Sequence, residues 1–319
     1  MRVAIITPVF NDWDAFAILV RRLDAALADQ ELSIDILAVD DGSIESISFG
    51  ASMAEELRAI KSIEVICLVC NLGHQRAIAV GMADIYNRKV HDIVCVMDSD
   101  GEDRPEDVLA LIEAHRSDPR AVIVAERGER SEGRLFLILY QIYKRLFLLL
   151  TGQTINFGNF CLLPFSALER VVFSSDTWNH LAASILKSRL PLHAIRLPRG
   201  TRFAGRSKMT FVPLIAHGLS AVAAFSETAF IRVSLLALGI CVLSGLGLLA
   251  IFIVRLGTDL AIPGWASTLS GLLVIILLQA LIFSAVAAFL ILGRRTNPGL
   301  IPARDALRYV RDKSVVAAA

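Results

Sequence analysis

An acidic string, Asp98-Ser-Asp-Gly-Glu-Asp103, directly follows the apolar run Ile93-Val-Cys-Val-Met97. If the run is a strand, it delivers the carboxylates of Asp98 and Asp100 together at a turn. Carboxylate oxygens suit Mg²⁺ and Mn²⁺, which also bridge to substrate phosphates. The string could instead serve only to cap a helix that begins at Pro105, because acids are favoured in a first turn. Taken alone, it leaves a metal site and a helix cap open.

Polar clusters also follow three other predicted strands, each at the point where the strand ends. Because parallel strands of an α/β sheet collect ligands at their carboxyl ends, four such clusters favour one common site over four unrelated turns. The three further clusters are Thr7-Pro-Val-Phe-Asn-Asp12, Asp40-Asp-Gly-Ser43 and Asn71-Leu-Gly-His-Gln-Arg76.

The elements that would position these clusters alternate along the chain. Short β-branched apolar runs predict strands at 3–6, 34–39, 63–69, 93–97 and 121–124. Helix-like stretches lie between them, at 15–28, 51–59, 75–86 and 105–115. This alternation predicts one α/β domain over residues 1–208, with a mainly parallel, Rossmann-like sheet covered by helices.

Two long apolar runs follow that domain, at 233–254 and 266–292. Each has roughly 20 residues or more, enough to cross about 30 Å of hydrocarbon. The first run has no ionisable residue and the second has only Gln279 as a strongly polar one; a charge at mid-membrane would cost about 2.5 kcal/mol or more. We expect a two-helix transmembrane hairpin over residues 232–293, and buried helices of a globular protein are the alternative.

Basic residues flank the predicted hairpin and predict its orientation. Arg232 precedes the first run and six basic residues follow the second, whereas the connecting loop offers only Arg255 against Asp259. By the positive-inside rule, both ends are expected in the cytoplasm, which makes the chain an integral membrane protein with a cytoplasmic domain. No signal peptide is expected, because Met1-Arg2 leads straight into the first predicted strand.

Residues 294–319 hold the six basic residues and are expected to form a basic cytoplasmic tail, either solvated or held on anionic headgroups. These residues are Arg294, Arg295, Arg304, Arg308, Arg311 and Lys313. Two further stretches, 135–150 and 209–231, are apolar but interrupted by polar side chains, and we expect each to be an interfacial helix. An ordinary core helix is the alternative for both.

Five cysteines lie mostly in apolar segments, as buried thiols of a reducing compartment would. Cys67-Leu-Val-Cys70 has the spacing of half a zinc site, but a strand would turn these two side chains to opposite faces, and the sequence holds no second pair. The net charge of +1 decides little, and we expect no nucleic-acid partner.

Basic and hydroxyl side chains lie just before the two candidate interfacial helices. The arginine fork suits phosphate, and lysine adds a point charge, so these residues are candidates for binding a phosphate near the membrane. A basic loop that only faces lipid headgroups is the alternative, chiefly for Arg199 and Arg206. The candidates are Arg127, Arg130, Arg199, Arg202, Arg206, Ser207 and Lys208.

Together these motifs resemble family 2 glycosyltransferases of the GT-A fold, and more narrowly the polyprenyl-phosphate sugar transferases related to dolichyl-phosphate mannose synthase and bacterial GtrB. The resemblance covers nearly the whole chain, because the two apolar runs match the bacterial transferase too. The matching pieces are Ile6-Thr-Pro-Val-Phe-Asn-Asp12, Val39-Asp-Asp-Gly-Ser43, Asn71-Leu-Gly-His-Gln75, Met97-Asp-Ser-Asp-Gly-Glu-Asp-Arg-Pro-Glu106 and Arg202-Phe-Ala-Gly-Arg-Ser-Lys208.

The resemblance implies transfer of a hexose-type sugar, with inversion, from a nucleotide-sugar to a polyprenyl phosphate such as undecaprenyl phosphate at the cytoplasmic face of the membrane. A uridine diphosphate donor is favoured, with its base near Pro8, Asp12 and Asp41. Mg²⁺ or Mn²⁺ on Asp98 and Asp100, with Glu102 beside them, would neutralise the diphosphate leaving group. The acceptor phosphate is already ionised at neutral pH, so positioning and electrostatic stabilisation would dominate over general-base catalysis.

The same resemblance implies roles for particular residues. The implied catalytic residues are Asp98, Asp100, Arg202 and Lys208, and the implied metal ligands are Asp98, Asp100 and Glu102. The implied contacts to the donor or to phosphate are Pro8, Asp12, Asp41, Asn71, Gly73, Gln75, Asp98, Arg127, Arg130 and Ser207.

The chain departs from the family's pattern in three places. Gly158-Asn-Phe-Cys161 stands where many relatives have Gly-Asp-Phe-Arg, so a carboxylate sometimes suggested as a base is the amide Asn159 here. Glu102 replaces a common glutamine and adds negative charge near the metal, and Arg206 replaces a common acidic residue. Either the acceptor needs no base, or the acceptor and the sugar differ.

Two other functions stay open on the sequence alone. A glycosyltransferase with a hydroxyl lipid as acceptor would have to deprotonate it, which Asn159 makes harder to explain. A non-catalytic membrane subunit that binds nucleotide-sugar or lipid would not need the intact acidic string. The chain is also a candidate for homo-oligomerisation, because Ala237, Cys241 and Gly245 put small residues on one helix face.

Overall fold

A computed structural model of the chain describes residues 1–45, 57–127, 134–204, 211–258, 264–296 and 299–318. Its contacts divide the chain into two compact units. The first unit holds residues 1–133, 155–224 and 299–319, and the second holds residues 134–154 and 225–298. Each unit is described by itself.

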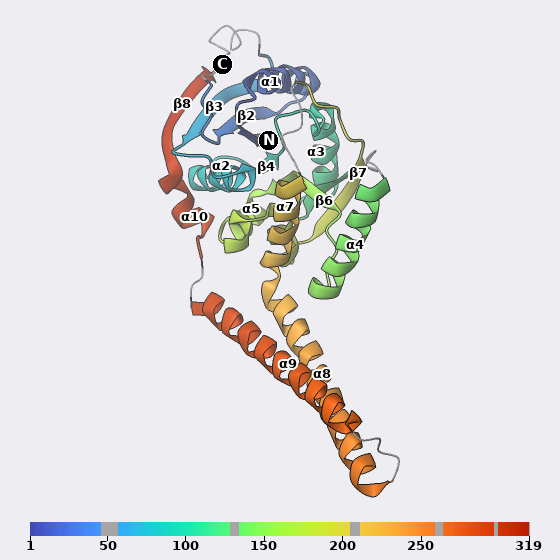
Figure 1. Ribbon diagram of the computed structural model, residues 1–319. Helices are drawn as coiled ribbons and strands as arrows, with labels where there is room; N and C mark the ends of the chain where they lie inside the picture. The colour runs from blue at the N-terminus through green and yellow to red at the C-terminus, as the bar shows by residue number, and fades with distance from the viewer. Residues whose placement is uncertain (46–56, 128–133, 205–210, 259–263, 297–298, 319) are drawn as a thin grey trace. The chain divides into compact units, whose positions relative to one another are not determined.

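The first unit is built on one eight-stranded sheet with the strand order β7-β5-β6-β4-β1-β2-β3-β8 (Figure 1). The central strands β1 and β2 are buried along almost their whole length, because helices cover both faces of the sheet. The strands are β1 Arg2–Val9, β2 Ser33–Asp40, β3 Ile60–Leu68, β4 Ile93–Val96, β5 Val122–Arg127, β6 Phe157–Pro164, β7 Leu192–Leu197 and β8 Val310–Ala318.

Because most strands of this sheet run in the same direction, the loops that follow them lie along one edge. β1 is parallel to β2 and β4, β2 is parallel to β3, and β5 is parallel to β7. β6 runs antiparallel to both β4 and β5, and β8 runs antiparallel to β3. The carboxyl ends of β1 to β5 and of β7 therefore meet the amino end of β6 along the same edge.

Helices pack on the two faces of the sheet through two separate apolar clusters. α1 (Trp13–Leu27) and α3 (Val108–Ser117) share one cluster with the sheet, in which Phe16 is fully buried. α2 (His74–Arg88), α5 (Phe165–Val172) and α6 (Leu181–Lys187) share the other. Full burial of one such large apolar side chain stabilises the fold by about 1.5–3 kcal/mol. The shorter elements are η2 Pro105–Asp107, η3 Ser175–Trp178, α10 Pro302–Asp305 and η4 Ala306–Tyr309, together with α7 Phe211–Ala224.

Asp35, near the amino end of β2, lies away from the edge just described. Its carboxylate accepts hydrogen bonds from His91 at 3.0 Å, Ser62 at 2.6 Å and Arg2 at 3.0 Å. Burial by itself would raise the pKa of Asp35, but these partners outweigh it and hold the pKa well below its usual value. The carboxylate therefore stabilises the fold in its ionised form.

The predicted fold class is confirmed: a mainly parallel α/β sheet, followed by two long apolar helices. All five predicted strands form. The predicted helix at 51–59 falls mainly on residues outside the described ranges, and residues 57–59 are not helical. The strands β6, β7 and β8 were not predicted.

The prediction of a basic tail at 294–319 is wrong for most of that segment. Residues 302–309 form α10 and η4, and β8 pairs with the edge strand β3 from Val310 to Ala318. Lys313 forms an ion pair with the buried carboxylate of Asp84 on α2. The side chains of β8 are largely exposed, so its basic residues meet solvent while its backbone covers a sheet edge that would otherwise be open.

The second unit holds the two apolar helices, α8 (Ser226–Gly257) and α9 (Trp265–Thr296). Segments of 32 and 29 residues in them contain stretches of 18 residues with mean hydropathies of 2.7 and 2.8, and are long and apolar enough to cross a membrane. Most large apolar side chains of these helices are exposed among the residues that the structure describes. This exposure favours contact with lipid over burial in a globular core.

The segments predicted as interfacial helices are helical, although their boundaries differ. α4 (Arg134–Thr151) belongs to the second unit, where Arg232 of α8 donates to the carbonyl oxygens of Leu148 at 3.2 Å and Leu149 at 2.7 Å. The Leu149 carbonyl lies in the last turn of α4, where helical partners run out, whereas the Leu148 carbonyl also accepts the Gly152 backbone N–H at 2.8 Å. Residues 209–231 do not form one helix, because the helical conformation is interrupted at Phe225, between α7 and α8. A position in the membrane interface stays a prediction for both segments.

Candidate active site

The carboxyl edge of the sheet gathers the acidic residues that the sequence singled out. Asp12 follows β1, Asp41 follows β2, and Asp98 and Asp100 follow β4. β4 lies beside β1, and β1 lies beside β2, so neighbouring strands deliver these residues to one region. The prediction that separate strand ends contribute to one site is supported by this topology.

The turn after β4 is held by hydrogen bonds among its own residues. The backbone N–H of Asp98 donates to the carboxylate of Asp103 at 2.9 Å, and the N–H of Glu102 donates to Asp100 Oδ1 at 2.9 Å. Burial, and then the negative charge of Asp98, raises the pKa of the Asp100 carboxyl. Crowded carboxylates of this kind are stabilised by a nearby cation.

Arg202 supplies a cation at this turn from a segment that is remote in the sequence. Its Nη2 donates to Asp12 Oδ2 at 3.0 Å, and its Nη1 lies 3.4 Å from Asp100 Oδ2. One guanidinium therefore joins the carboxyl ends of β1 and β4. Its Nε donates to the Ala204 carbonyl at 3.3 Å, which leaves further N–H groups of the guanidinium able to bind another anion.

Two close backbone approaches hold the Arg202 segment against the acidic turn. Gly200 N–H donates to the Glu102 carbonyl at 2.9 Å, and Phe203 N–H donates to the Asp100 carbonyl at 2.8 Å. A Cβ on Gly200 would come within 2.2 Å of the Gly101 oxygen. Gly101 has a φ of +92°, and a Cβ there would meet the Phe203 ring at 2.6 Å. Only glycine fits at both positions.

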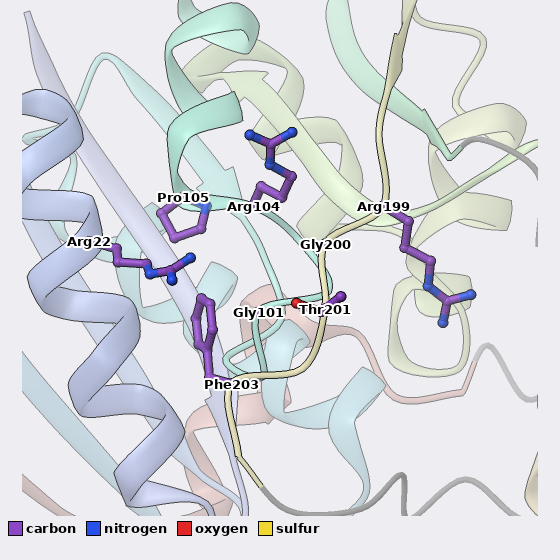
Figure 2. A pocket seen from close by; sticks show the side chains of 8 residues that line it. All are labelled: Arg22, Gly101, Arg104, Pro105, Arg199, Gly200, Thr201 and Phe203. Atoms are coloured by element: carbon purple, nitrogen blue, oxygen red, sulfur yellow. The ribbon is translucent and has the colours of Figure 1, made fainter.

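A pocket of about 240 Å³ lies beside this contact (Figure 2). Arg22 of α1 faces Phe203, with its guanidinium carbon 4.8 Å from the ring centre. Figure 2 shows Arg104 and Arg199 extending in different directions, so the three arginines that line the pocket do not converge on one point. The pocket adjoins the acidic turn but offers no focused anion site.

Glu102 lies in the same turn as Asp100, and its negative charge also raises the pKa of the Asp100 carboxyl. Its carboxylate pairs with Arg199 at 2.6 Å. Within the residues that the structure describes, no three His, Cys, Asp or Glu side chains are grouped so that they could hold a metal ion. The role of Glu102 as a third metal ligand stays a prediction, and its carboxylate would have to leave Arg199 in order to bind a cation.

The two carboxylates of Asp98 and Asp100 are by themselves suitable ligands for a divalent cation that arrives with a nucleotide. Mg²⁺ is usually bound through one or two carboxylates together with substrate phosphates and water, rather than by a cage of protein ligands. Two carboxylates at one turn, next to an arginine that can also bind phosphate, meet that requirement. Mn²⁺ accepts the same oxygen ligands.

Asp41 has a structural task that the sequence did not reveal. Its carboxylate accepts the backbone N–H groups of Leu72 at 2.7 Å and Gly73 at 2.9 Å, which ties the end of β2 to the turn before α2. Burial raises the pKa of Asp41, although the two backbone hydrogen bonds act in the opposite direction. Its predicted contact with a nucleotide base stays a prediction.

Gln75 and Asn159 meet inside the same domain. Gln75 Nε2 donates to Asn159 Oδ1 at 2.7 Å, and Gln75 Oε1 accepts the Leu181 backbone N–H at 2.7 Å. Gln75 was predicted to contact the donor, and the structure gives it this buried pairing, which sequence spacing alone could not predict because 84 positions separate the two residues.

The other predicted residues are distributed as follows. Pro8 is buried within β1, Asn71 is exposed after β3, and Arg127 is the last residue of β5. Arg130, Ser207 and Lys208, with Arg206, lie outside the described residues.

Sequence reasoning missed two contributors to the site. Asp103 is almost fully buried and accepts the Asp98 N–H; its place within the acidic string was the available signal. Asn11 has a positive φ of 46° and donates its backbone N–H to Ser43 Oγ at 2.8 Å, which links the turns after β1 and β2. Asparagine is one of the few residues that tolerate this conformation.

An open α/β sheet with carboxylates and an arginine at the carboxyl ends of its strands is an arrangement in which α/β proteins bind their ligands. The family described as glycosyl transferase family 2 matches residues 4–174, more than half of the chain. The protein therefore belongs to glycosyl transferase family 2, and the resemblance found in its motifs is confirmed.

Curated relatives are similar over long stretches. The chain is 25% identical over 322 residues to an uncharacterized glycosyltransferase, YkcC, of Bacillus subtilis (strain 168), with 98% of this chain and 93% of the relative covered. It is 26% identical over 222 residues to the undecaprenyl-phosphate 4-deoxy-4-formamido-L-arabinose transferase of Klebsiella pneumoniae subsp. pneumoniae. That match covers 67% of this chain and 64% of the relative, a little under two thirds of its length.

Among solved structures, the chain is similar to glucosyl-3-phosphoglycerate synthase from Mycobacterium tuberculosis, in complex with Mn²⁺, uridine-diphosphate-glucose and phosphoglyceric acid. The TM-score is 0.49 at 12% identity, with 72% of this chain and 79% of that chain covered. A likeness at this level supports no conclusion about ligands or substrates.

Proposed function

We propose that this protein is an inverting glycosyltransferase that moves a hexose-type sugar from a uridine-diphosphate donor to a polyprenyl phosphate. The observation that carries the proposal is the Arg202 guanidinium between Asp12 and Asp100, in a chain that also has two helices apolar enough to cross a membrane. The acceptor is supported by the relative whose name states an undecaprenyl-phosphate sugar transferase.

In the proposed reaction, an oxygen of the acceptor phosphate attacks the anomeric carbon of the sugar. The oxygen lone pair forms the new bond to carbon while the bond from the anomeric carbon to the diphosphate breaks, and those electrons leave with uridine diphosphate. No proton has to move, because a phosphate monoester has a second pKa of about 6 and is largely ionised at neutral pH. A divalent cation, when bound, would neutralise charge on the diphosphate.

The residues of this chain would hold and orient the reactants. Asp98 and Asp100 are the proposed ligands of the cation. Arg202 has N–H groups beyond those that face Asp12 and Asp100, and these suit a phosphate oxygen. Because the guanidinium is held at two points, little of its freedom would remain to be lost when it binds the substrate.

Arg127, Arg130, Ser207 and Lys208 are proposed to add contacts to phosphate, and Lys208 to act in catalysis. Their support is the match to the family's motifs and the affinity of such side chains for phosphate. Removing one phosphate contact at a time, as in Lys208→Met, should raise KM for the acceptor. An unchanged KM would show that the substituted residue does not bind the acceptor phosphate.

We also propose that the catalytic domain lies on the cytoplasmic face of the inner membrane. The basic residues at both ends of the α8–α9 hairpin support this orientation. In the variant Thr258→Cys, the new thiol lies just after α8 and should react with an impermeant maleimide added outside intact spheroplasts. Reaction only after lysis would reverse the orientation.

The function is tested by transfer from a panel of radiolabelled uridine- and guanosine-diphosphate sugars, with purified protein in detergent. The acceptors are undecaprenyl phosphate and, as the matched control, a hydroxyl lipid such as diacylglycerol. A lipid-extractable product from undecaprenyl phosphate alone is expected. Product only from the hydroxyl lipid, or binding of donor with no product from any lipid, would overturn the proposal.

A further inference from the structure

Gln75 and Asn159 form a buried amide pair beside the proposed site. Gln75 is the second residue of α2 and Asn159 the third residue of β6, and their exposed fractions are 7% and 8%. Asn159 is also the position where the family's motif has a carboxylate. The direction in which its amide points therefore decides whether the side chain presents a donor or an acceptor to a ligand at this edge.

Hydrogen bonding fixes the orientation of both amides. The partner of the Leu181 backbone N–H must be an oxygen, since a backbone N–H only donates, and this atom is Gln75 Oε1 at 2.7 Å. The other end of Gln75 is then Nε2, a donor, and it lies 2.7 Å from Asn159. That atom of Asn159 must accept and is Oδ1, so its Nδ2 group is directed away from Gln75.

Strand register puts Asn159 next to the acidic turn. β4 and β6 pair antiparallel, with Val94 opposite Leu163 and Val96 opposite Cys161. Continued by two residues beyond the last pair, the same register sets Asn159 opposite Asp98. Asn159 therefore lies at the edge where the carboxyl ends of β1, β2 and β4 meet. Among the residues that the structure describes, Asn159 Nδ2 has no hydrogen-bond partner.

We propose that Asn159 is a positioning residue that donates from Nδ2 to an anionic oxygen of the acceptor phosphate, with Gln75 holding the amide in that direction. This inference rests on the proposed function and deepens it, because it assigns a contact with the acceptor phosphate to one side chain. An amide nitrogen can donate but cannot remove a proton. It suits an acceptor that arrives already ionised, whereas a hydroxyl acceptor would find no base at this position.

Two isosteric substitutions test the direction of the amide. Asn159→Asp keeps an oxygen to accept from Gln75 Nε2 but turns a carboxylate, instead of a donor, toward the site. Gln75→Glu keeps an oxygen for the Leu181 N–H, but its second oxygen now needs a donor, so the Asn159 amide turns over and directs Oδ1 toward the site. Each variant replaces the donor with a negative or acceptor group while preserving the packing.

The measurement is the affinity of purified protein in detergent for farnesyl phosphate, a short polyprenyl phosphate, with farnesol as the uncharged control. Hydrogen bonds to charged groups correspond to about a 10- to 100-fold change in affinity. We expect a loss of that size for farnesyl phosphate in both variants, with the affinity for farnesol within about 2-fold of wild type in both and the affinity for uridine diphosphate within about 2-fold of wild type in Asn159→Asp.

The outcomes separate this inference from the proposed function. Wild-type protein that transfers sugar to undecaprenyl phosphate, with both variants binding farnesyl phosphate as tightly as wild type, would overturn the role of Asn159 and leave the function standing. Wild-type protein that binds no farnesyl phosphate and transfers to no polyprenyl phosphate would overturn both. If Asn159→Asp fails to fold, Gln75→Glu gives the same decision.

Discussion

Replacing Gly200 by alanine should separate the Arg202 segment from the acidic turn without unfolding the domain. The new Cβ would lie 2.2 Å from the Gly101 oxygen, 2.9 Å from Arg104 Cγ and 3.2 Å from the Glu102 oxygen. Ordinary carbon–oxygen contacts are about 3.3–3.6 Å. The segment must therefore move away from the turn by about 1 Å, since two of the three contacts are to backbone atoms.

This displacement has a calculable cost. It stretches the hydrogen bonds from Gly200 N–H and Phe203 N–H, now 2.9 and 2.8 Å, beyond useful length. Two such bonds contribute about 1 kcal/mol each, and their loss replaces the cost of overpacking, about 1–3 kcal/mol, that the segment would bear if it stayed in place. A misplacement of about 1 Å in a group that orients substrate lowers activity about 100-fold, and we expect kcat/KM to fall by about that factor.

The assay is sugar transfer to undecaprenyl phosphate, together with thermal unfolding of the purified protein. Gly200→Ala should lose activity while Tm falls by only a few degrees, because the strain can be relieved by detaching a surface segment. Gly239→Ala is the matched control, since a Cβ there meets nothing within 4 Å. Full activity in Gly200→Ala would show that the contact between Gly200 and the acidic turn does not position the site.

Three further variants test other parts of the structure. Arg202→Lys should lower kcat/KM by about 10- to 100-fold with little change in Tm, because lysine cannot face two carboxylates with a fork. Asp35→Asn should reduce the free energy of unfolding by about 2 kcal/mol at pH 7. Since the folded-state pKa of Asp35 lies below the unfolded value of 3.8, that difference should shrink as the pH falls below about 3.8. Lys313→Met should lower the free energy of unfolding by about 1–2 kcal/mol and speed amide hydrogen exchange in β8, because the buried negative charge of Asp84 loses one of its positive partners.

Each of these has a clear contrary result. Wild-type kcat/KM in Arg202→Lys would mean that a point charge suffices at the turn. An Asp35→Asn deficit that stays constant down to pH 2 would show that the carboxylate's charge does not stabilise the fold. Unchanged exchange in β8 after Lys313→Met would leave strand pairing alone as its anchor.

The sequence predicted the parts of the fold that local pattern controls. Strands buried on both faces, such as β1 and β2, read as continuous β-branched runs, and the polar residues that follow them mark the edge that carries the site. The apolar helices were found for the same reason, since length and hydropathy are local properties. The position of Asp98 and Asp100 at the end of a central strand followed directly.

Features that depend on distant partners could not be predicted. Arg202 and Asp12 are 190 positions apart, and nothing local shows that Arg199 pairs with Glu102, 97 positions away. β7 is a largely exposed strand with weak patterning, and β8 lies among charged residues that read as a solvated tail. Only the pairing of β8 with β3 reveals that the chain returns to the sheet after α9.

The most direct test of the account is transfer of radiolabelled sugar to undecaprenyl phosphate by wild type and Asp100→Ala, with Mg²⁺, with Mn²⁺ and with chelator. We predict a metal-dependent, lipid-extractable product from wild type and none from Asp100→Ala, while the variant keeps the wild-type Tm. Undiminished product from Asp100→Ala, or full wild-type activity in chelator, would contradict the claim that chemistry occurs at the carboxyl end of β4.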